Sequence, residues 1–162
     1  MVFTQKYTII SPIEIIAEGQ EFASNDWPLH TTIADTFAIN SINEDFISLM
    51  RTVALGRNIK IAAKELSYFG KSADIEVMLL QSSDELYRLH SDIVDMLLSC
   101  GASFNDPQYT KSGFVGHVTQ QPRKRMSTGE EISLHSIALI DMFPDENPNN
   151  RRVIKVINFR EE

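Results

Sequence analysis

Two copies of the pattern His-x-Thr constrain this chain most strongly, because each lies in a stretch with the alternation of a β-strand. The first copy, in "WPLHTTIADTF", contains His30 and Thr32, and the second, in "FVGHVTQQ", contains His117 and Thr119. Side chains two residues apart on a strand point to the same face. Each copy therefore places an imidazole beside a hydroxyl on one face of a sheet.

Together the two copies predict a site for acid–base chemistry on a phosphate ester. A single strand histidine near a threonine is more often structural, but two copies in matched strands favour one shared site. An unperturbed histidine titrates at about 6.5, so one imidazole can accept a proton from the attacking oxygen while the other donates to the leaving oxygen. The hydroxyls can donate to the non-bridging phosphate oxygens. Because the sequence has no metal-ligand spacing, we expect no metal and no cofactor.

The remaining pattern predicts an α+β fold of about seven strands and two helices. Ser41 with Glu44, and Ser82 with Glu85, are candidate capping boxes for the helices, which end near Gly56 and Gly101. A hairpin turn is expected at Gly70-Lys71-Ser72. The predicted strands span residues 5–10, 29–37, 59–69, 75–80, 114–121, 132–142 and 153–159, and the first helix spans 43–55.

Composition predicts a single cytoplasmic domain. A chain of 162 residues supports one sizeable core, so we expect residues 1–162 to form one two-lobed unit and a monomer. The single cysteine, Cys100, fits a reducing compartment and is expected to be a small buried residue. No signal peptide or long apolar run is present, which predicts no membrane partner. The net charge of −7 disfavours extended duplex nucleic acid and favours a small nucleotide or an RNA terminus.

On these residues the chain resembles the 2H phosphoesterase superfamily, close to its bacterial 2′-5′ RNA ligase and cyclic phosphodiesterase branch. The likeness is carried by the two His-x-Thr motifs and extends through "YTII", "ELSYFGKSADIEVMLLQ" and "DELYRLHSDIVDMLLSCG". It implies a two-lobed, pseudo-symmetric α+β fold, with mainly antiparallel sheets lining a central groove and helices on the outside.

The resemblance also implies roles for residues. His30 and His117 become the catalytic pair, without an assignment of base and acid, and Thr32 and Thr119 bind the phosphate. The implied function is that of a metal-independent phosphodiesterase, a hydrolase of nucleoside or RNA-terminal 2′,3′-cyclic phosphates or of 2′-5′ linkages. Two alternatives remain open: degradation of cyclic oligonucleotide signals, and a non-catalytic nucleotide- or RNA-binding module.

Some positions depart from the family pattern. Gln120 replaces the apolar residue that usually follows the second threonine, although Ile33 keeps the pattern after the first. Gly116 replaces a frequent proline before the second histidine, and Thr31 replaces the usual apolar residue inside the first motif.

Other residues are candidates for the rim of the groove or for structure. Arg123 and Arg125, in the basic "PRKR" loop, can attract a phosphate-bearing end, and Trp27, Tyr109 or Phe37 can stack on a base. For His90 we expect a solvated helix face, and for His135 a structural role.

Overall fold

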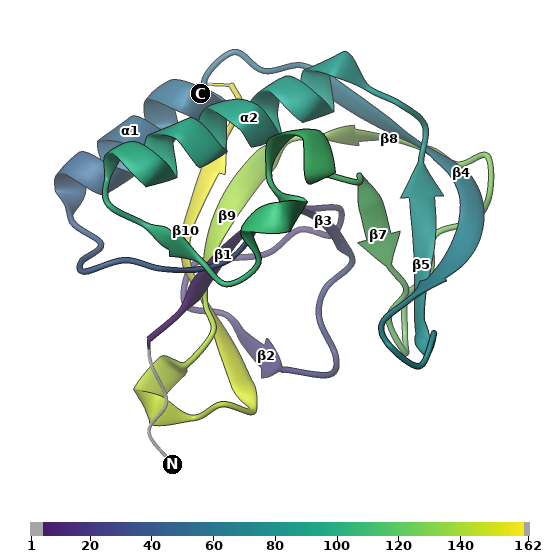
Figure 1. The fold of residues 1–162 in the computed structure, drawn as a ribbon, viewed down its shortest axis with the longest axis horizontal. Helices are drawn as coiled ribbons and strands as arrows, with labels where there is room; N and C mark the ends of the chain where they lie inside the picture. The colour runs from purple at the N-terminus through teal and green to yellow at the C-terminus, as the bar shows by residue number, and fades with distance from the viewer. Residues whose placement is uncertain (1–4, 161–162) are drawn as a thin grey trace.

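The computed structural model describes residues 5–160, in which ten strands form one curled sheet with two helices on one side (Figure 1). The pairs between strands are antiparallel, as predicted for an α+β fold. The strands are β1 (Tyr7–Pro12), β2 (Glu21–Ala23), β3 (His30–Ala38), β4 (Ile59–Phe69), β5 (Ile75–Leu80), β6 (Ser103–Phe104), β7 (His117–Thr119), β8 (Glu131–Leu134), β9 (Ser136–Asp141) and β10 (Asn150–Asn158). The helices are α1 (Glu44–Ala54) and α2 (Asp84–Ser99), with short 3₁₀ turns η1 (Pro107–Tyr109), η2 (Lys111–Gly113) and η3 (Pro144–Glu146).

The strand order brings the two His-x-Thr strands together. The sheet runs β2-β10-β9-β1-β3-β7-β5-β4-β8, and β6 pairs with β3 outside this path. One half of the sheet thus ends at β3, which carries the first motif, and the other half begins at β7, which carries the second. They join through an antiparallel pair in which Thr31 lies opposite Val118.

Asparagine and serine cap the two helices at positions that differ from the predicted ones. The side chain of Asn43 accepts from the backbone N–H of Phe46 at 2.9 Å, and Ser83 accepts from the N–H of Leu86 at 3.1 Å. The predicted caps at Ser41 and Ser82 were therefore wrong by two residues and one residue. Asn and Ser are comparable N-cap residues, so two candidates close together could not be ranked from the sequence.

Apolar side chains fill both faces of the sheet, but unequally. A large cluster between the sheet and the helices includes Ile9, Ile33 and Leu89, all at most 1% exposed. A smaller cluster on the opposite face contains Ile10 and Ile140. The adjacent residues Ile9 and Ile10 thus point to opposite sides of β1, as alternation requires. Thr32, which pairs with Ile10, and the other motif side chains described below lie on the side of Ile10.

Several strand predictions needed correction. The first strand continues through Pro12, and the strand predicted at 132–142 is broken at His135 into β8 and β9. The second motif strand is shorter than predicted, since β7 contains three residues. Between the predicted strands 5–10 and 29–37, where no further strand was predicted, the structure contains β2, and β10 begins earlier than predicted, at Asn150.

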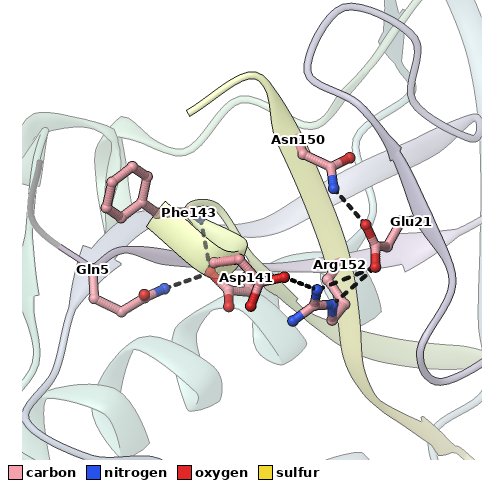
Figure 2. Close-up of polar contacts among 7 residues, drawn as sticks. Gln5, Glu21, Asp141, Phe143, Asn150 and Arg152 are labelled. Carbon is pink, nitrogen blue, oxygen red and sulfur yellow. Dashed lines mark hydrogen bonds and ion pairs between the residues drawn. The ribbon is translucent and has the colours of Figure 1, made fainter. Parts of the chain in front are cut away.

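Side-chain contacts attach the short strand β2 to β10, as Figure 2 shows. Glu21 accepts hydrogen bonds from Asn150 and from Arg152, with the Arg152 Nη2 at 3.1 Å. On the other side of β10, Asp141 accepts from Gln5 and from the N–H of Phe143. The contacts of Glu21 add to the three backbone pairs by which β2 is joined to β10. Within residues 5–160, neither helix is long and apolar enough to span a bilayer.

Candidate active site

The register of β3 and β7 places the four motif side chains on one face. Thr31 lies opposite Val118, so His30 falls opposite Thr119 and Thr32 falls opposite His117. Side chains opposite each other on one face of an antiparallel pair have Cβ atoms about 4.5–5.5 Å apart, and diagonal neighbours are about 7–8 Å apart. The two imidazoles are diagonal neighbours, close enough that a positive charge on His117 lowers the pKa of His30.

Both imidazoles are oriented in the same way, each by a backbone carbonyl two residues before its own strand begins. The Nδ1 atom of His30 lies 2.8 Å from the carbonyl oxygen of Pro28, and that of His117 lies 2.8 Å from the carbonyl oxygen of Val115. A carbonyl oxygen only accepts, so each neutral ring carries its proton on Nδ1. Each Nε2 is then an unprotonated acceptor. Within residues 5–160 neither Nε2 atom has a hydrogen-bond partner in the protein. Neither is among the buried side-chain atoms that lack a partner, so both Nε2 atoms are accessible to solvent.

The three threonines around the site have different tasks. Thr31 is fully buried, and its Oγ1 donates to the carbonyl oxygen of His117 at 2.8 Å, which joins the two motif strands. This bond explains why a polar residue stands where an apolar one is usual. In the described part of the chain the hydroxyls of Thr32 and Thr119 have no protein partner, so both are available to a ligand.

A bulge in β3 brings a carboxylate to the same site. Ile10 pairs with Thr32 and Ile9 pairs with Ala34, so Ile33 is an extra residue on β3. Such an insertion shifts the alternation of the residues that follow. Asp35 consequently lies with Thr32 and His117 on the wall of one cavity. Asp35 was missed as a site residue, because a bulge leaves no clear signal in an alternating pattern.

A cavity of about 500 Å³ adjoins His117, and its surface is mainly apolar, with several aromatic side chains in its lining. The ring of Phe69 meets the His117 ring edge to face, with centroids 4.9 Å apart. Tyr109 and Phe114 reach the cavity from the loop between α2 and β7. Pockets of this kind, with few polar groups, are typical of small-molecule sites. Phe69 and Phe114 were also missed, since Phe69 at the end of β4 and Phe114 in the loop before β7 resemble ordinary core residues in the sequence.

Burial lowers the pKa values of both motif histidines. Desolvation lowers the pKa of His30 to about 4, against the raising effect of its bond to Pro28, and the charge of His117 lowers it further. Desolvation also lowers the pKa of His117, while the bond to Val115 and the negative charge of Asp35 raise it. The two rings therefore differ, because an acidic neighbour acts on His117 alone.

The proposed rim residues divide into two groups. Trp27 lies against His30, with ring centroids 5.0 Å apart, and Tyr109 lines the cavity beside His117. Arg123 instead pairs with Asp26 at 2.6 Å, and Arg125 pairs with Glu76. Neither arginine lines the large cavity. Phe37 is fully buried in the core, so its prediction as a stacking residue was wrong.

Two further predictions are corrected or explained. His90 is 2% exposed, so the expected solvated helix face was wrong. Its ring bonds both β3 and the loop before β7, which the sequence could not reveal because both partners are backbone atoms. Gln120 departs from the family pattern because its amide bonds the N–H and carbonyl of Met126, both at 2.8 Å, and closes the basic loop. Cys100 is partly buried.

Within residues 5–160 no group of three or more His, Cys, Asp or Glu side chains is arranged to hold a metal ion. The donor groups at the site are two imidazoles and two hydroxyls, with one carboxylate nearby. The expectation of metal-independent chemistry stays a prediction that requires a chelation experiment.

The fold is that of the LigT-like 2H phosphoesterases, an α+β fold with a curled antiparallel sheet. A phosphoesterase crystal structure matches over 98% of this chain and 100% of its own, with a TM-score of 0.61 at 10% identity. The E. coli LigT structure with 3′-AMP matches over 98% and 100%, with a TM-score of 0.55 at 10% identity. A Thermus thermophilus protein matches over 83% and 79%, with a TM-score of 0.53 at 17% identity. No protein-family model and no curated protein matches the sequence.

Proposed function

We propose that this protein is a 2H-type phosphodiesterase that acts, without a metal, on nucleoside or RNA-terminal 2′,3′-cyclic phosphates or on 2′-5′ linkages. The observation that supports this most is the placement of His30 and Thr32 beside Thr119 and His117 on one face of two adjacent strands. Two imidazoles with bare Nε2 atoms and two free hydroxyls supply the groups that in-line displacement at phosphorus requires.

In the proposed reaction, water attacks the phosphorus of the cyclic ester. One neutral imidazole takes a proton from the water through Nε2 as the new phosphorus–oxygen bond forms. The other, protonated on Nε2, gives its proton to the ribose oxygen as the ring phosphorus–oxygen bond breaks. The product is a nucleoside phosphomonoester with a free neighbouring hydroxyl. The Thr32 and Thr119 hydroxyls donate to the two non-bridging oxygens, on which the negative charge resides.

The surroundings of the rings favour an assignment of roles. Desolvation lowers the pKa of His117, but the bond to Val115 and the negative charge of Asp35 oppose this shift, which favours a proton on His117 over one on His30. His30 lies 7% exposed against Trp27 and is the more strongly desolvated ring, which supports the neutral form. We therefore assign His30 as the general base and His117 as the general acid.

The cavity beside His117 is proposed to hold the nucleoside. Its aromatic side chains, Phe69, Tyr109 and Phe114, provide faces on which any base can stack. E. coli LigT is described in complexes with 3′-AMP, NADP+, ATP and phosphate, so a protein with this fold takes small nucleotides. Carboxylates pair both rim arginines, which favours a small substrate over an extended polyanion.

The decisive test supplies four kinds of ligand in the presence of EDTA. These are 2′,3′-cyclic mononucleotides, an RNA with a terminal 2′,3′-cyclic phosphate, a 2′-5′-linked dinucleotide and a cyclic dinucleotide. Turnover of any of the first three that survives chelation and is lost in His30→Ala and in His117→Ala supports the proposal. Turnover of the cyclic dinucleotide alone, or binding without product, contradicts it, as does activity abolished by EDTA.

A further inference from the structure

We propose that His90 of α2 is a positioning residue that ties the backbone of β3 to the loop 105–116 and so fixes the aromatic wall of the cavity beside His117. The Nδ1 atom of His90 lies 2.7 Å from the carbonyl oxygen of Ile33, directly after the first motif. Its Nε2 atom accepts from the backbone N–H of Lys111 at 2.9 Å. One side chain thus links the strand of the first motif with the segment that leads into the second.

The two bonds define the state of the ring. The carbonyl of Ile33 accepts only, so Nδ1 carries the proton, and the N–H of Lys111 donates only, so Nε2 must be bare. A neutral ring with this tautomer satisfies both partners, and a protonated ring cannot. Burial, at 2% exposure, lowers the pKa of His90 and keeps the neutral form, and the charge of Lys111 acts in the same direction.

The loop itself is held in a conformation that needs such support. Lys111 has a φ of 56°, in the left-handed region that non-glycine residues rarely adopt. Its ammonium group is bound to the same helix, at 2.7 Å from Ser91 Oγ and 2.7 Å from Asp95 Oδ1. At Gly113 an added Cβ would lie 1.7 Å from the carbonyl oxygen of Gln108, so only glycine fits there. A residue keeps an unfavourable backbone conformation only when contacts with the surrounding structure hold it there.

The two hydrogen bonds of His90, to Ile33 and Lys111, form a clamp that acts on the cavity through Phe114. The rings of His90 and Phe114 are stacked, with centroids 3.9 Å apart and an interplanar angle of 14°. Phe114, together with Tyr109 and Val115 of the same loop, lines the cavity, and Val115 provides the carbonyl that orients His117. His90 therefore fixes both the ligand wall and, through the loop, the approach to the second motif.

Two isosteric variants separate the two bonds of the clamp. In His90→Gln the side-chain oxygen occupies the place of Nε2 and can still accept from Lys111, whereas the bond to Ile33 is lost. In His90→Asn the side-chain nitrogen occupies the place of Nδ1 and can still donate to Ile33, whereas the bond to Lys111 is lost. The readout is amide hydrogen exchange of peptides covering 105–116 and 30–38, measured by mass spectrometry.

We expect His90→Asn to speed exchange in 105–116 by about fivefold or more, because a lost buried hydrogen bond typically shifts an opening equilibrium by at least that factor. His90→Gln should leave exchange in this segment within about twofold of the wild type. Equal acceleration in both variants, or none in either, overturns the proposal. If His90→Asn does not fold, the ¹⁵N shifts of the wild-type imidazole decide, since a proton on Nε2 of His90 at neutral pH also overturns it.

The effect on catalysis rests on the proposed function and is measured separately. With a 2′,3′-cyclic mononucleotide as substrate, His90→Asn should raise KM about fivefold and change kcat less than about twofold, because the wall contacts the nucleoside and not the reacting phosphorus. His90→Gln should restore KM toward the wild type. A drop in kcat alone contradicts the positioning role, and a wild type without turnover refutes the proposed function while leaving the exchange result valid.

Discussion

Thr31 Oγ1 donates a hydrogen bond to the carbonyl oxygen of His117 at 2.8 Å, so the residue inside the first motif holds the backbone of the second. Thr31 is fully buried at the join of β3 and β7, where Thr31 and Val118 are the one pair of residues in register between the two strands. The site thus depends on a contact between the two motifs that is separate from the four groups that face the substrate.

The two histidines should be needed separately and as a unit. We expect His30→Ala and His117→Ala each to lower kcat/KM about 100-fold or more, and the double variant to lose much less than the product of the two. Steady-state kinetics on a 2′,3′-cyclic mononucleotide measure this. The exposed His135 supplies the matched control, since His135→Ala should retain activity. A loss below about tenfold in either motif variant contradicts the assignment.

Replacing threonine by valine should separate phosphate binding from structure. Thr32→Val and Thr119→Val should lower kcat/KM by about 10- to 100-fold with little change in stability, because each removes a hydroxyl that faces the ligand. Thr31→Val should lower the free energy of unfolding by about 1–3 kcal/mol, because it removes the hydrogen bond from a fully buried hydroxyl to the carbonyl of His117. Urea unfolding and kinetics on all three variants check this. Equal effects in the three would show that their tasks are not distinct.

Removing the carboxylate beside His117 should move one limb of the pH–rate profile. Desolvation lowers the pKa of His117 and the charge of Asp35 opposes that shift, so Asp35→Asn should lower the pKa further. If His117 is the general acid, the alkaline limb of kcat/KM shifts to lower pH. A shift of the acidic limb instead would assign His117 as the base. If neither limb shifts, the charge of Asp35 does not affect the pKa of His117.

Stability should fall in mildly acidic solution because His30 is buried in its neutral form. The pKa of His30 is lowered from 6.5 to about 4 in the folded protein, so the unfolded chain binds a proton that the folded chain resists. This contribution to stability is fully present above pH 6.5 and is lost as the pH falls to about 4, with a total of about 3 kcal/mol. Urea unfolding between pH 7 and pH 4.5 measures it.

The control for this prediction is His30→Asn, in which the amide nitrogen can still donate to the carbonyl of Pro28. The variant lacks the titrating ring, so its free energy of unfolding should depend less on pH over the same interval. His117 and His90 keep their own lowered pKa values and retain part of the slope. An unchanged slope would mean that His30 is protonated as easily in the folded protein as in the unfolded chain.

The local sequence pattern was enough to predict the α+β fold and the two His-x-Thr motifs. The extent of β7 and the position of Asp35 depend on contacts between distant parts of the chain, which the pattern does not contain. The limits of β4 and β5 follow from alternation and a glycine turn, and the structure matches them residue for residue. The limits of β7 did not follow, because its extent depends on how far β3 and β5 can flank it. Asp35 depends on a bulge at Ile33, which a period-two pattern does not reveal.

His90 shows most clearly what one sequence cannot reveal. Its helix neighbours Arg88 and Asp92 suggested a solvated face, yet the ring is covered by Phe114 from a loop far along the chain. Its partners, at Ile33 and Lys111, are main-chain atoms, and a backbone N–H or carbonyl exists at almost every position. Side-chain identity therefore carried no information about these bonds.

Each motif imidazole takes its orientation from a carbonyl two residues earlier, just before its own strand begins, so the tautomer of each neutral ring is set without a bond from the opposite half of the sheet. The charge of each ring, in contrast, depends on the other half of the sheet, because the charge of His117 lowers the pKa of His30 and the carboxylate of Asp35 on β3 acts to raise that of His117.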